Sequence, residues 1–489
     1  MLSILVGHSF FLRFDRKQLR RCKPYPPLAT LQVAALLRRL GHEVTLFDAM
    51  LARNLEEYGR TLRRARPQLL VLYEDNYNFL SKMCLARMRV AACRMIGAAR
   101  GAGARVIVAG SDATDAPTAY LEAGADAVLV GEGFAALEQL VSRLCDRIDL
   151  ETPALIEGVA GVALAPAPSS QRPSHHAPDP PPPAWDLLDI ERYRSLWRAS
   201  HGYFSLNMTA SRGCPFRCNW CAKPIWGNRY LQRTPGEVAA EMTDLKRRFA
   251  PDHIWFADDI FGFRADWVSE FAEAVHKMDG AVPFTIQTRA DLVTGRMSAA
   301  LREAGCREAW LGAESGSQRI LDAMNKGTSV AEIHAARARL ASAGIRVGFF
   351  IQLGYLGEEL SDILATRQLI ETAQPDDVGV SVSYPLPGTR FYELVKDQLR
   401  RDSHWRESDD LAMMFQGTYT SAFYRTVRDL LHAQVTLRGG SRTPQTIMGL
   451  LTERTLRHRW ARLLACERRF RTPPVAVAHA LAQPMSSPT

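Results

Sequence analysis

The sequence predicts an α/β protein: an N-terminal doubly wound, Rossmann-like parallel sheet, then an incomplete parallel (β/α)6 barrel, then a helical C-terminal segment. Two observations carry this prediction. Short apolar runs alternate with helical patterns in both halves of the chain, and a Pro-rich stretch without periodicity separates the halves. The expected boundaries are 1–150 for the first domain, 151–195 for the linker, 196–400 for the barrel and 401–489 for the helical region with its basic, partly disordered tail.

Composition is that of a globular protein, with 47% hydrophobic and 23% charged residues. We expect no membrane-spanning helix, because no run of about eighteen apolar residues occurs. The apolar start lacks a basic leader and a cleavage site, so it is expected to be a first strand. Nine cysteines, an odd number in a long chain, indicate a reducing compartment and hence a cytoplasmic protein.

The formal net charge of +9 suits an anionic substrate, a negatively charged membrane surface or simply a solvated exterior. No sequence motif of a DNA- or RNA-reading module is present, so no nucleic-acid partner is expected.

The first domain is predicted from an alternation of strand and helix signals. Residues 2–6 are apolar, and residues 29–40 carry apolar side chains at helical spacing up to Gly41, a typical C-terminal stop. Four further short runs begin at His42, Gln68, Arg105 and Asp126 and are rich in branched apolar residues, as buried parallel strands are.

Ligands of such sheets bind beyond the carboxyl ends of the strands. The glycines there would let a large flat ligand approach the backbone, although ordinary turn glycines would give the same pattern. Polar residues that follow the third strand would face such a ligand or the neighbouring domain. The candidate ligand-binding residues of this domain are Tyr73, Glu74, Gly110, Ser111, Gly131, Glu132 and Gly133.

The stretch RGCPFRCNWCAKPIWG, residues 212–227, places Cys214, Cys218 and Cys221 close together. Thiolates are the usual ligands of iron–sulfur clusters, and steps of four and three residues allow one loop to wrap a cluster corner. Three ligands would leave one iron open. The alternatives are a structural zinc site, which needs a fourth ligand that the spacing does not offer, and three unrelated core cysteines.

Alternating apolar and polar residues at 204–209 predict a half-buried strand that delivers these cysteines at its carboxyl end. Five more strands, each followed by helical sequence, begin near residues 252, 283, 309, 347 and 377. Parallel barrels hold their chemistry at the carboxyl ends of the strands, although residues there also serve as helix caps; we expect Ser317 to be such a cap. The candidates at these ends are Asp258, Asp259, Gln287, Arg289, Glu314 and Ser315.

The CxxxCxxC spacing with Trp220 before the last cysteine resembles the radical S-adenosylmethionine (SAM) enzymes. The resemblance implies a [4Fe–4S] cluster on the three cysteines, which would act in catalysis. It also implies adenine contacts from Trp220, Ile351 and Gly354, and it assigns the methionine amino group to the turn at Asp258 and Asp259. Glu314 and Ser315 would meet the ribose or carboxylate.

The stretches KPYPPLATLQVAALLRRLGHEVTLFDA, VAGSDAT and LVGEG resemble the cobalamin-binding domain upstream of many radical SAM cores. The DxHxxG stretch whose His ligates cobalt in other cobalamin folds is absent, so cobalamin would bind without a protein His ligand. A domain that has kept the fold and lost the cofactor is the alternative.

The resemblance therefore implies a cobalamin-linked radical SAM enzyme, related to the anaerobic magnesium-protoporphyrin monomethyl ester cyclase group. Methyl transfer to an unactivated carbon is the expected reaction, with radical oxidative cyclisation as one alternative and a non-catalytic iron–sulfur or corrinoid carrier as another. Expected partners are a small-molecule, lipid-like or tetrapyrrole substrate and an external electron donor such as flavodoxin or ferredoxin. The basic amphipathic stretch 447–471 would contact a membrane surface only if its apolar face were exposed.

Overall fold

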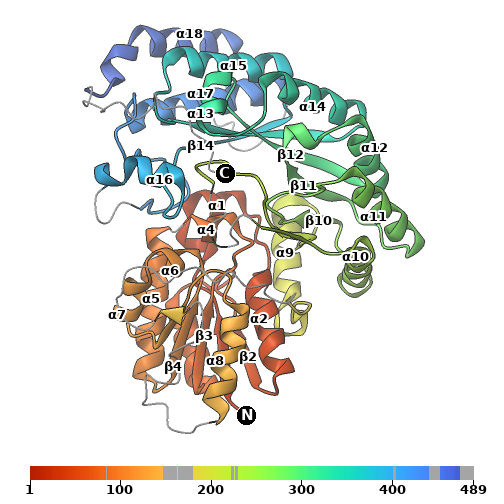
Figure 1. Cartoon of the computed structure of the whole chain (residues 1–489), viewed down its shortest axis with the longest axis vertical. Helices are drawn as coiled ribbons and strands as arrows, with labels where there is room; N and C mark the ends of the chain where they lie inside the picture. Colours follow the sequence, from red (N-terminus) through yellow and green to blue (C-terminus); the bar gives the residue numbers. More distant parts are fainter. Residues whose placement is uncertain are drawn as a thin grey trace, which may run out of the picture.

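The computed structural model describes most of the chain. Figure 1 shows the N-terminal sheet at the bottom of the view and the second sheet above it, with the C-terminal helices along the upper side of the second sheet. The structure describes residues 1–83, 85–146, 162–163, 180–221, 225, 229–399, 404–439 and 452–473. Most of the predicted linker and the end of the predicted tail lie outside these ranges.

The N-terminal domain is built on a six-stranded sheet of order β2-β1-β3-β4-β5-β6. The parallel strands are β1 (Ser3–Gly7), β2 (Glu43–Phe47), β3 (Leu69–Tyr73), β4 (Arg105–Ala109) and β5 (Ala127–Leu129). The edge strand β6 (Val162–Ala163) runs antiparallel to β5 and lies within the stretch that we predicted to be linker.

Helices cover both faces of this sheet. Val6 and Val71 point to the face covered by α2 (Leu28–Arg39) and α8 (Phe134–Asp146), whereas Leu5 and Leu70 point to the face covered by α3 (Leu55–Ala65) and α5 (Ala86–Gly101). The predicted doubly wound fold is therefore confirmed. The short helices of this domain are η1 (Leu12–Phe14), α1 (Arg16–Arg21), α4 (Phe79–Lys82), α6 (Ser111–Asp115) and α7 (Pro117–Glu122).

The second sheet has six parallel strands in the order β14-β13-β12-β11-β10-β7 and does not close, as an incomplete barrel should. Its strands are β7 (Ser205–Met208), β10 (His253–Phe256), β11 (Phe284–Thr288), β12 (Cys306–Glu314), β13 (Arg346–Leu353) and β14 (Asp377–Val382). The helices that alternate with them are α10 (Pro235–Phe249), α11 (Ala265–Lys277), α12 (Gly295–Ala304), α13 (Gln318–Ala323), α14 (Val330–Ser342), α15 (Leu360–Ala373) and α16 (Arg390–Val395).

Smaller elements complete the second domain. Residues 185–201 lead into β7 through η3 (Trp185–Leu187) and α9 (Ile190–His201). A two-stranded antiparallel hairpin, β8 (Ser211–Gly213) and β9 (Tyr230–Gln232), flanks the cysteine loop. The 3-10 helices are η4 (Ala290–Leu292) and η5 (Lys396–Gln398).

The predicted half-buried character of β7 is wrong, because the polar side of the strand is buried as well. Ser205 and Asn207 are at most 3% exposed. The segment before α2 covers them: the hydroxyl of Tyr25 lies 3.2 Å from Ser205 Oγ, and the Asn207 amide donates to the carbonyl of Pro26 at 3.0 Å. The alternation therefore marks an interface between domains and not a wet surface.

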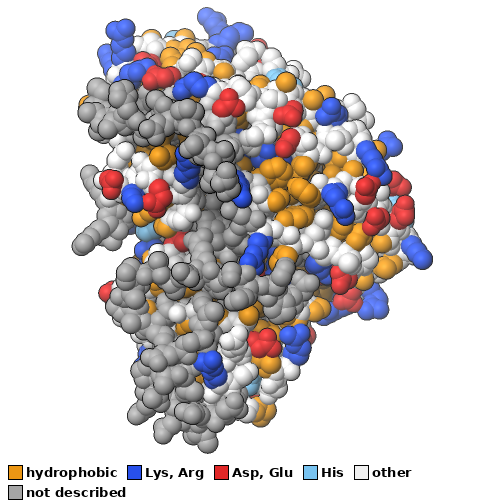
Figure 2. All heavy atoms as spheres, viewed as in Figure 1, with side chains coloured by type: hydrophobic (Ala, Val, Ile, Leu, Met, Phe, Trp, Pro, Cys, Tyr) orange, Lys and Arg blue, Asp and Glu red, His pale blue; other side chains and the backbone are white. Residues whose placement is uncertain are grey.

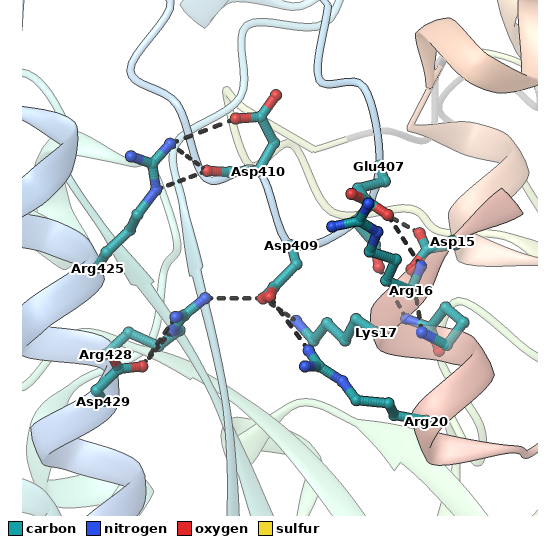
Figure 3. A network of polar contacts seen from close by, with 12 residues as sticks. Asp15, Arg16, Lys17, Arg20, Glu407, Asp409, Asp410, Arg425, Arg428 and Asp429 are labelled. Carbon is teal, nitrogen blue, oxygen red and sulfur yellow. Dashed lines mark hydrogen bonds and ion pairs between the residues drawn. The ribbon is translucent and has the colours of Figure 1, made fainter.

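Beyond the barrel, the segment 404–416, which we name the strap, leads to α17 (Ser421–Gly439), α18 (Glu453–Ala465) and η7 (Glu467–Phe470). Ion pairs hold the strap on both sides (Figure 3). The Asp409 carboxylate lies 3.9 Å from Lys17 Nζ on α1 and 2.8 Å from Arg428 Nη1 on α17. Glu407 accepts from the backbone N–H of Arg16 at 2.9 Å. The strap therefore ties the N-terminal domain to the C-terminal helices.

The helix α18 packs its apolar side inward. Leu456, Trp460 and Leu463 are buried, and the guanidinium of Arg367 on α15 lies over the Trp460 ring at 4.8 Å. Its outward side carries arginines, which contribute to the basic side chains along the upper edge of Figure 2. The condition for membrane contact through the apolar face is therefore not met. Among the helices of the described residues, none is both long and apolar enough to cross a lipid bilayer.

Candidate functional site

The cysteine loop follows β8 at the carboxyl edge of the second sheet. Cys214 is buried, and Cys218 and Cys221 are half-buried. Burial, followed by the neighbouring Cys218, raises the pKa of Cys221 to about 12, and Cys214 adds to the effect. The three thiols therefore share one electrostatic environment, and a bound cation is needed to keep them deprotonated together.

Within the described residues, no three His, Cys, Asp or Glu side chains lie as the ligands of one metal ion would. A [4Fe–4S] cluster binds each cysteine through a different iron, so it suits thiols that share a loop without converging on one point.

The Arg289 guanidinium lies beside Cys218. The Arg289 Nη1 lies 3.6 Å from the Cys218 Sγ, and its guanidinium stacks on the Phe216 ring at 3.7 Å. Arg289 is 4% exposed and also pairs with Asp291 and donates to the Lys326 carbonyl at 2.7 Å. The structure thus places Arg289, a candidate cofactor-binding residue, against the cysteine loop.

Asp258 supports the backbone that leads into the cysteine loop. Its carboxylate accepts from the Ala210 N–H at 3.1 Å and from the Ser211 hydroxyl at 2.5 Å. Burial raises the pKa of Asp258 to about 7. The Gln287 amide donates to the Asp258 carbonyl at 2.5 Å. Both residues therefore have structural partners at the place where we predicted cofactor ligands.

Asp259, the next residue, meets the N-terminal domain. Its carboxylate lies 2.5 Å from the Nζ of Lys82 on α4, and the Lys82 side chain is only 5% exposed. A second ion pair also joins the two domains. Arg212, two residues before Cys214, binds the carboxylate of Glu132, which lies beyond β5. The carboxyl edges of the two sheets are therefore joined at the predicted cofactor residues.

Glu314 ends β12 with a positive φ of 59° and faces Lys326. The Lys326 Nζ lies 2.9 Å from Glu314 Oε1, and both side chains are 6% exposed. Burial is the largest single effect on Lys326 and lowers its pKa, but the Glu314 carboxylate and Cys218 together outweigh it, so the pKa lies above its usual value. The Lys326 Nζ also lies 6.0 Å from the Trp220 ring, so this pair borders the cysteine loop.

Ser315 and Ser317 have local partners. The Ser315 hydroxyl lies 3.2 Å from Thr366 Oγ1 and accepts from the Ser317 N–H at 3.1 Å. Ser317 occupies the N-cap position of α13, as predicted, but its hydroxyl donates to Asp362 at 2.6 Å instead of capping the helix.

The three residues predicted to contact adenine, Trp220, Ile351 and Gly354, have different surroundings. Ile351 is 1% exposed within the barrel core. Trp220 packs on an apolar cluster that includes Tyr355 and Phe391, and its buried indole N–H has no hydrogen-bond partner among the described residues. Gly354 has a φ of +71°, and a Cβ there would lie 2.9 Å from the Sδ of Met413 on the strap. Trp220 thus keeps a donor available for a ligand.

At the carboxyl edge of the N-terminal sheet, packing explains why glycine occupies positions 110 and 133. A Cβ on Gly110 would lie 2.8 Å from the Glu74 side chain, and one on Gly133 would lie 3.0 Å from Leu129. The Glu74 carboxylate accepts from the Ser9 N–H at 3.0 and 3.1 Å, and burial raises its pKa.

Tyr73 donates to the Glu132 carbonyl, and burial raises the pKa of Tyr73 well above its usual value. The Gly131 N–H donates to Thr114 Oγ1 at 3.0 Å. The whole predicted set therefore lies at one edge.

This edge also holds buried polar atoms without partners among the described residues: both amide atoms of Asn76 and the hydroxyls of Ser81 and Ser111. Unpaired buried polar groups are costly and call for a ligand or water. Ser111 and Lys82 line a cavity that also touches Ile225 of the cysteine loop. The cavity has room for about one water molecule, so a corrin would have to displace the side chains that line it. The polar groups nevertheless fit a ligand rich in amides.

Sequence reasoning missed Lys82, Arg212 and Lys326. Lys82 lies in NFLSKM, a stretch of mixed polar and apolar residues that gives no signal of a buried lysine. No local pattern identified the other two.

Residues 208–370, from the end of β7 to α15, match the model of the radical SAM superfamily. This chain carries a radical SAM domain. The expectation of a radical SAM enzyme, with SAM and a [4Fe–4S] cluster as its cofactors, is thereby confirmed at the level of the domain.

Relatives of this chain include proteins named as methyltransferases or methylases. An uncharacterized methyltransferase of Pyrococcus horikoshii is 26% identical over 293 residues, 58% of this chain and 61% of that protein. The hopanoid C-3 methylase of Methylococcus capsulatus is 25% identical over 76% of this chain and 69% of the methylase. An anaerobic magnesium-protoporphyrin IX monomethyl ester cyclase of Rubrivivax gelatinosus is 25% identical over 44% of this chain and 39% of the cyclase.

Solved structures confirm the fold across both domains. The cobalamin-dependent SAM radical enzyme OxsB superimposes with a TM-score of 0.66 at 16% identity, covering 95% of this chain and 71% of OxsB. The radical SAM methyltransferase TsrM of Kitasatospora setae, solved with cobalamin and a [4Fe–4S] cluster, gives a TM-score of 0.64 at 18% identity, covering 81% of this chain and 75% of TsrM.

Proposed function

We propose that this chain is a cobalamin-linked radical SAM enzyme that transfers a methyl group from SAM to an unactivated carbon of a small molecule. The observation that carries the proposal is the meeting of the two carboxyl edges, where Lys82 binds Asp259 and Arg212 binds Glu132 beside the cysteine loop. The names of the relatives and the fold shared with TsrM and OxsB support it.

In this proposal Cys214, Cys218 and Cys221 bind the cluster, and the polar edge of the N-terminal sheet binds cobalamin without a His ligand to cobalt. When bound, these groups would supply an electron and a methyl carrier. Arg289 holds positive charge at Cys218. We further propose that a small protein such as flavodoxin or ferredoxin delivers the electrons in the cytoplasm.

The test is anaerobic reconstitution of the full chain with iron and sulfide, followed by SAM and dithionite. We expect formation of 5′-deoxyadenosine or S-adenosylhomocysteine, and a cobalamin absorption spectrum in protein supplied with cobalamin. Cys218→Ala should abolish both SAM products, whereas Cys466→Ala, which alters a half-buried thiol at the end of α18, should retain them. Absence of both products from the unmodified protein would contradict the proposal.

Radical oxidative cyclisation is the second candidate, because relatives named as cyclases align over part of the chain. SAM labelled at its methyl carbon separates the two candidates: methyl transfer moves the label to product or cobalamin, whereas cyclisation leaves it on methionine. A spectrum of bound cobalamin with neither SAM product would instead indicate a non-catalytic carrier.

A further inference from the structure

A pocket of about 600 Å³ lies against the strap. Its volume is in the range of sites that bind one small molecule. The residues that line it are Gln398, His404, Trp405, Ala412, Met413, Met414, Phe415 and Gln416.

The pocket lies at the carboxyl ends of the last two barrel strands. Met413 packs on Gly354, just beyond β13. Tyr384, just beyond β14, lies edge-on to the Trp405 ring at 4.7 Å, and its hydroxyl lies 3.1 Å from His404 Nδ1. The pocket therefore shares an edge with the cysteine loop and with the Glu314 turn, where a barrel places its substrate.

Residues of the N-terminal domain also contact two of the lining residues, His404 and Trp405. The Arg89 Nη2 on α5 lies 3.1 Å from His404 Nε2, and the Ala86 N–H donates to the Trp405 carbonyl at 2.8 Å. Asp112 binds the same Arg89 guanidinium at 2.5 and 2.6 Å. Residues from both domains therefore position the lining side chains.

The described residues of the lining have neutral side chains such as those of Gln, Trp and Met. None of the eight lining residues is Asp, Glu, Lys or Arg. The contact between the Arg89 guanidinium and His404 Nε2 already occupies this ring nitrogen of the lining. A charged ligand would lose its hydration without gaining a partner.

Four lining residues, Ala412, Met413, Met414 and Phe415, are apolar and consecutive. Methionine side chains adapt to varied apolar shapes. The amides of Gln398 and Gln416 already have protein partners: Gln398 Oε1 accepts from the Gln416 N–H at 2.9 Å, and the Gln416 side chain donates to the Pro473 carbonyl. The ion pairs of Asp409 and Glu407 hold the strap and thus the pocket in shape (Figure 3).

We propose that this pocket binds the substrate of the radical SAM reaction, and that the substrate is an uncharged small molecule with an apolar part that packs on Met413, Met414 and Phe415. The identity of the pocket as a substrate site rests on the proposed function; its preference for uncharged ligands rests on the lining alone.

The test is fluorescence titration of the full chain with two probes that share one ring skeleton. N-phenyl-1-naphthylamine is neutral, and 8-anilino-1-naphthalenesulfonate carries a sulfonate. We expect the neutral probe to bind one site at least tenfold more tightly. Met414→Lys should weaken its binding at least tenfold, and Ala412→Phe, which fills the pocket without adding charge, should do the same.

Met278→Lys is the matched control, because Met278 is 42% exposed at the end of α11 and does not line the pocket. It should leave binding unchanged. Equal affinity for the two probes, or neutral-probe binding that resists both pocket variants, would overturn the proposal.

The titration requires neither SAM nor the cluster. If the pocket behaves as expected and no SAM product forms, the proposed function fails alone. If SAM is consumed and neither pocket variant weakens binding of the neutral probe, the pocket inference fails alone.

Discussion

Glu358 lies in the loop after β13 and is fully buried. Its Oε2 accepts from the Gly354 N–H at 2.6 Å, and its Oε1 has no partner in the described residues. Burial raises the pKa of Glu358 from 4.5 to about 8. Near neutral pH the side chain is therefore a protonated acid that holds the Gly354 turn. Glu358→Gln replaces it with a neutral group of the same shape.

The pKa gives the size and sign of the effect. Between pH 6 and 8 the native state keeps the Glu358 proton, whereas the unfolded state, with a pKa of 4.5, has already lost it. Stability is then lost as the pH rises, by about 1.4 kcal/mol per pH unit. The free energy of unfolding should fall by about 2 to 3 kcal/mol across this window and level off above pH 8, and Glu358→Gln should remove that fall.

The assay is urea unfolding followed by tryptophan fluorescence at pH 6, 7, 8 and 9. The difference between the wild-type protein and the variant isolates Glu358, since every other titrating group is common to both. Glu453→Gln is the control, because Glu453 is 80% exposed on α18 and should change the pH dependence little. A wild-type curve that runs parallel to the Glu358→Gln curve from pH 6 to 9 would refute the reasoning.

Three more predictions concern stability and use urea unfolding as their measurement. Lys82→Met leaves Asp259 without its buried partner and should lower the free energy of unfolding by about 3 to 5 kcal/mol, with partial recovery when Asp259→Asn is added; additive effects would contradict coupling. Asp409→Asn should lower it by about 1 kcal/mol at low salt and by less in 1 M NaCl, and equal losses would argue against an ionic strap. Gly316→Ala should lower it by about 2 to 3 kcal/mol, since the new Cβ would lie 2.3 Å from a carbonyl oxygen of α15. Gly295→Ala, where nothing lies within 4 Å, should be neutral or slightly stabilising.

The strands and their ends were predictable because each has a recognisable pattern of residues in the local sequence. Val6 and Leu5 of β1 point to opposite faces of the sheet, and both faces are covered, so the whole strand is apolar in sequence. Gly41, with a φ of +86°, follows the end of α2 at the predicted position. Strand ends of a parallel sheet meet at one edge. That rule placed Asp258 and Glu314 near the cysteine loop without any knowledge of their contacts.

The partners of these residues were not predictable, because each is set by chain that is distant in sequence. Asp259 follows the predicted turn, yet its partner Lys82 lies 177 residues earlier. Ser205 and Asn207 alternate as an exposed strand face would, and only residues 25 and 26 of the other domain show that they are buried. The local sequence pattern cannot distinguish a polar strand face that is exposed to solvent from one that contacts polar atoms of another domain.

The two ion pairs across the domain gap have a consequence for protein engineering. A chimera that joins this N-terminal domain to the barrel of a relative would keep Lys82 and Glu132 but lose Asp259 and Arg212 unless the relative supplied matching charges. Placing an aspartate and an arginine at the two matching positions of the relative's barrel should therefore decide whether such a hybrid assembles.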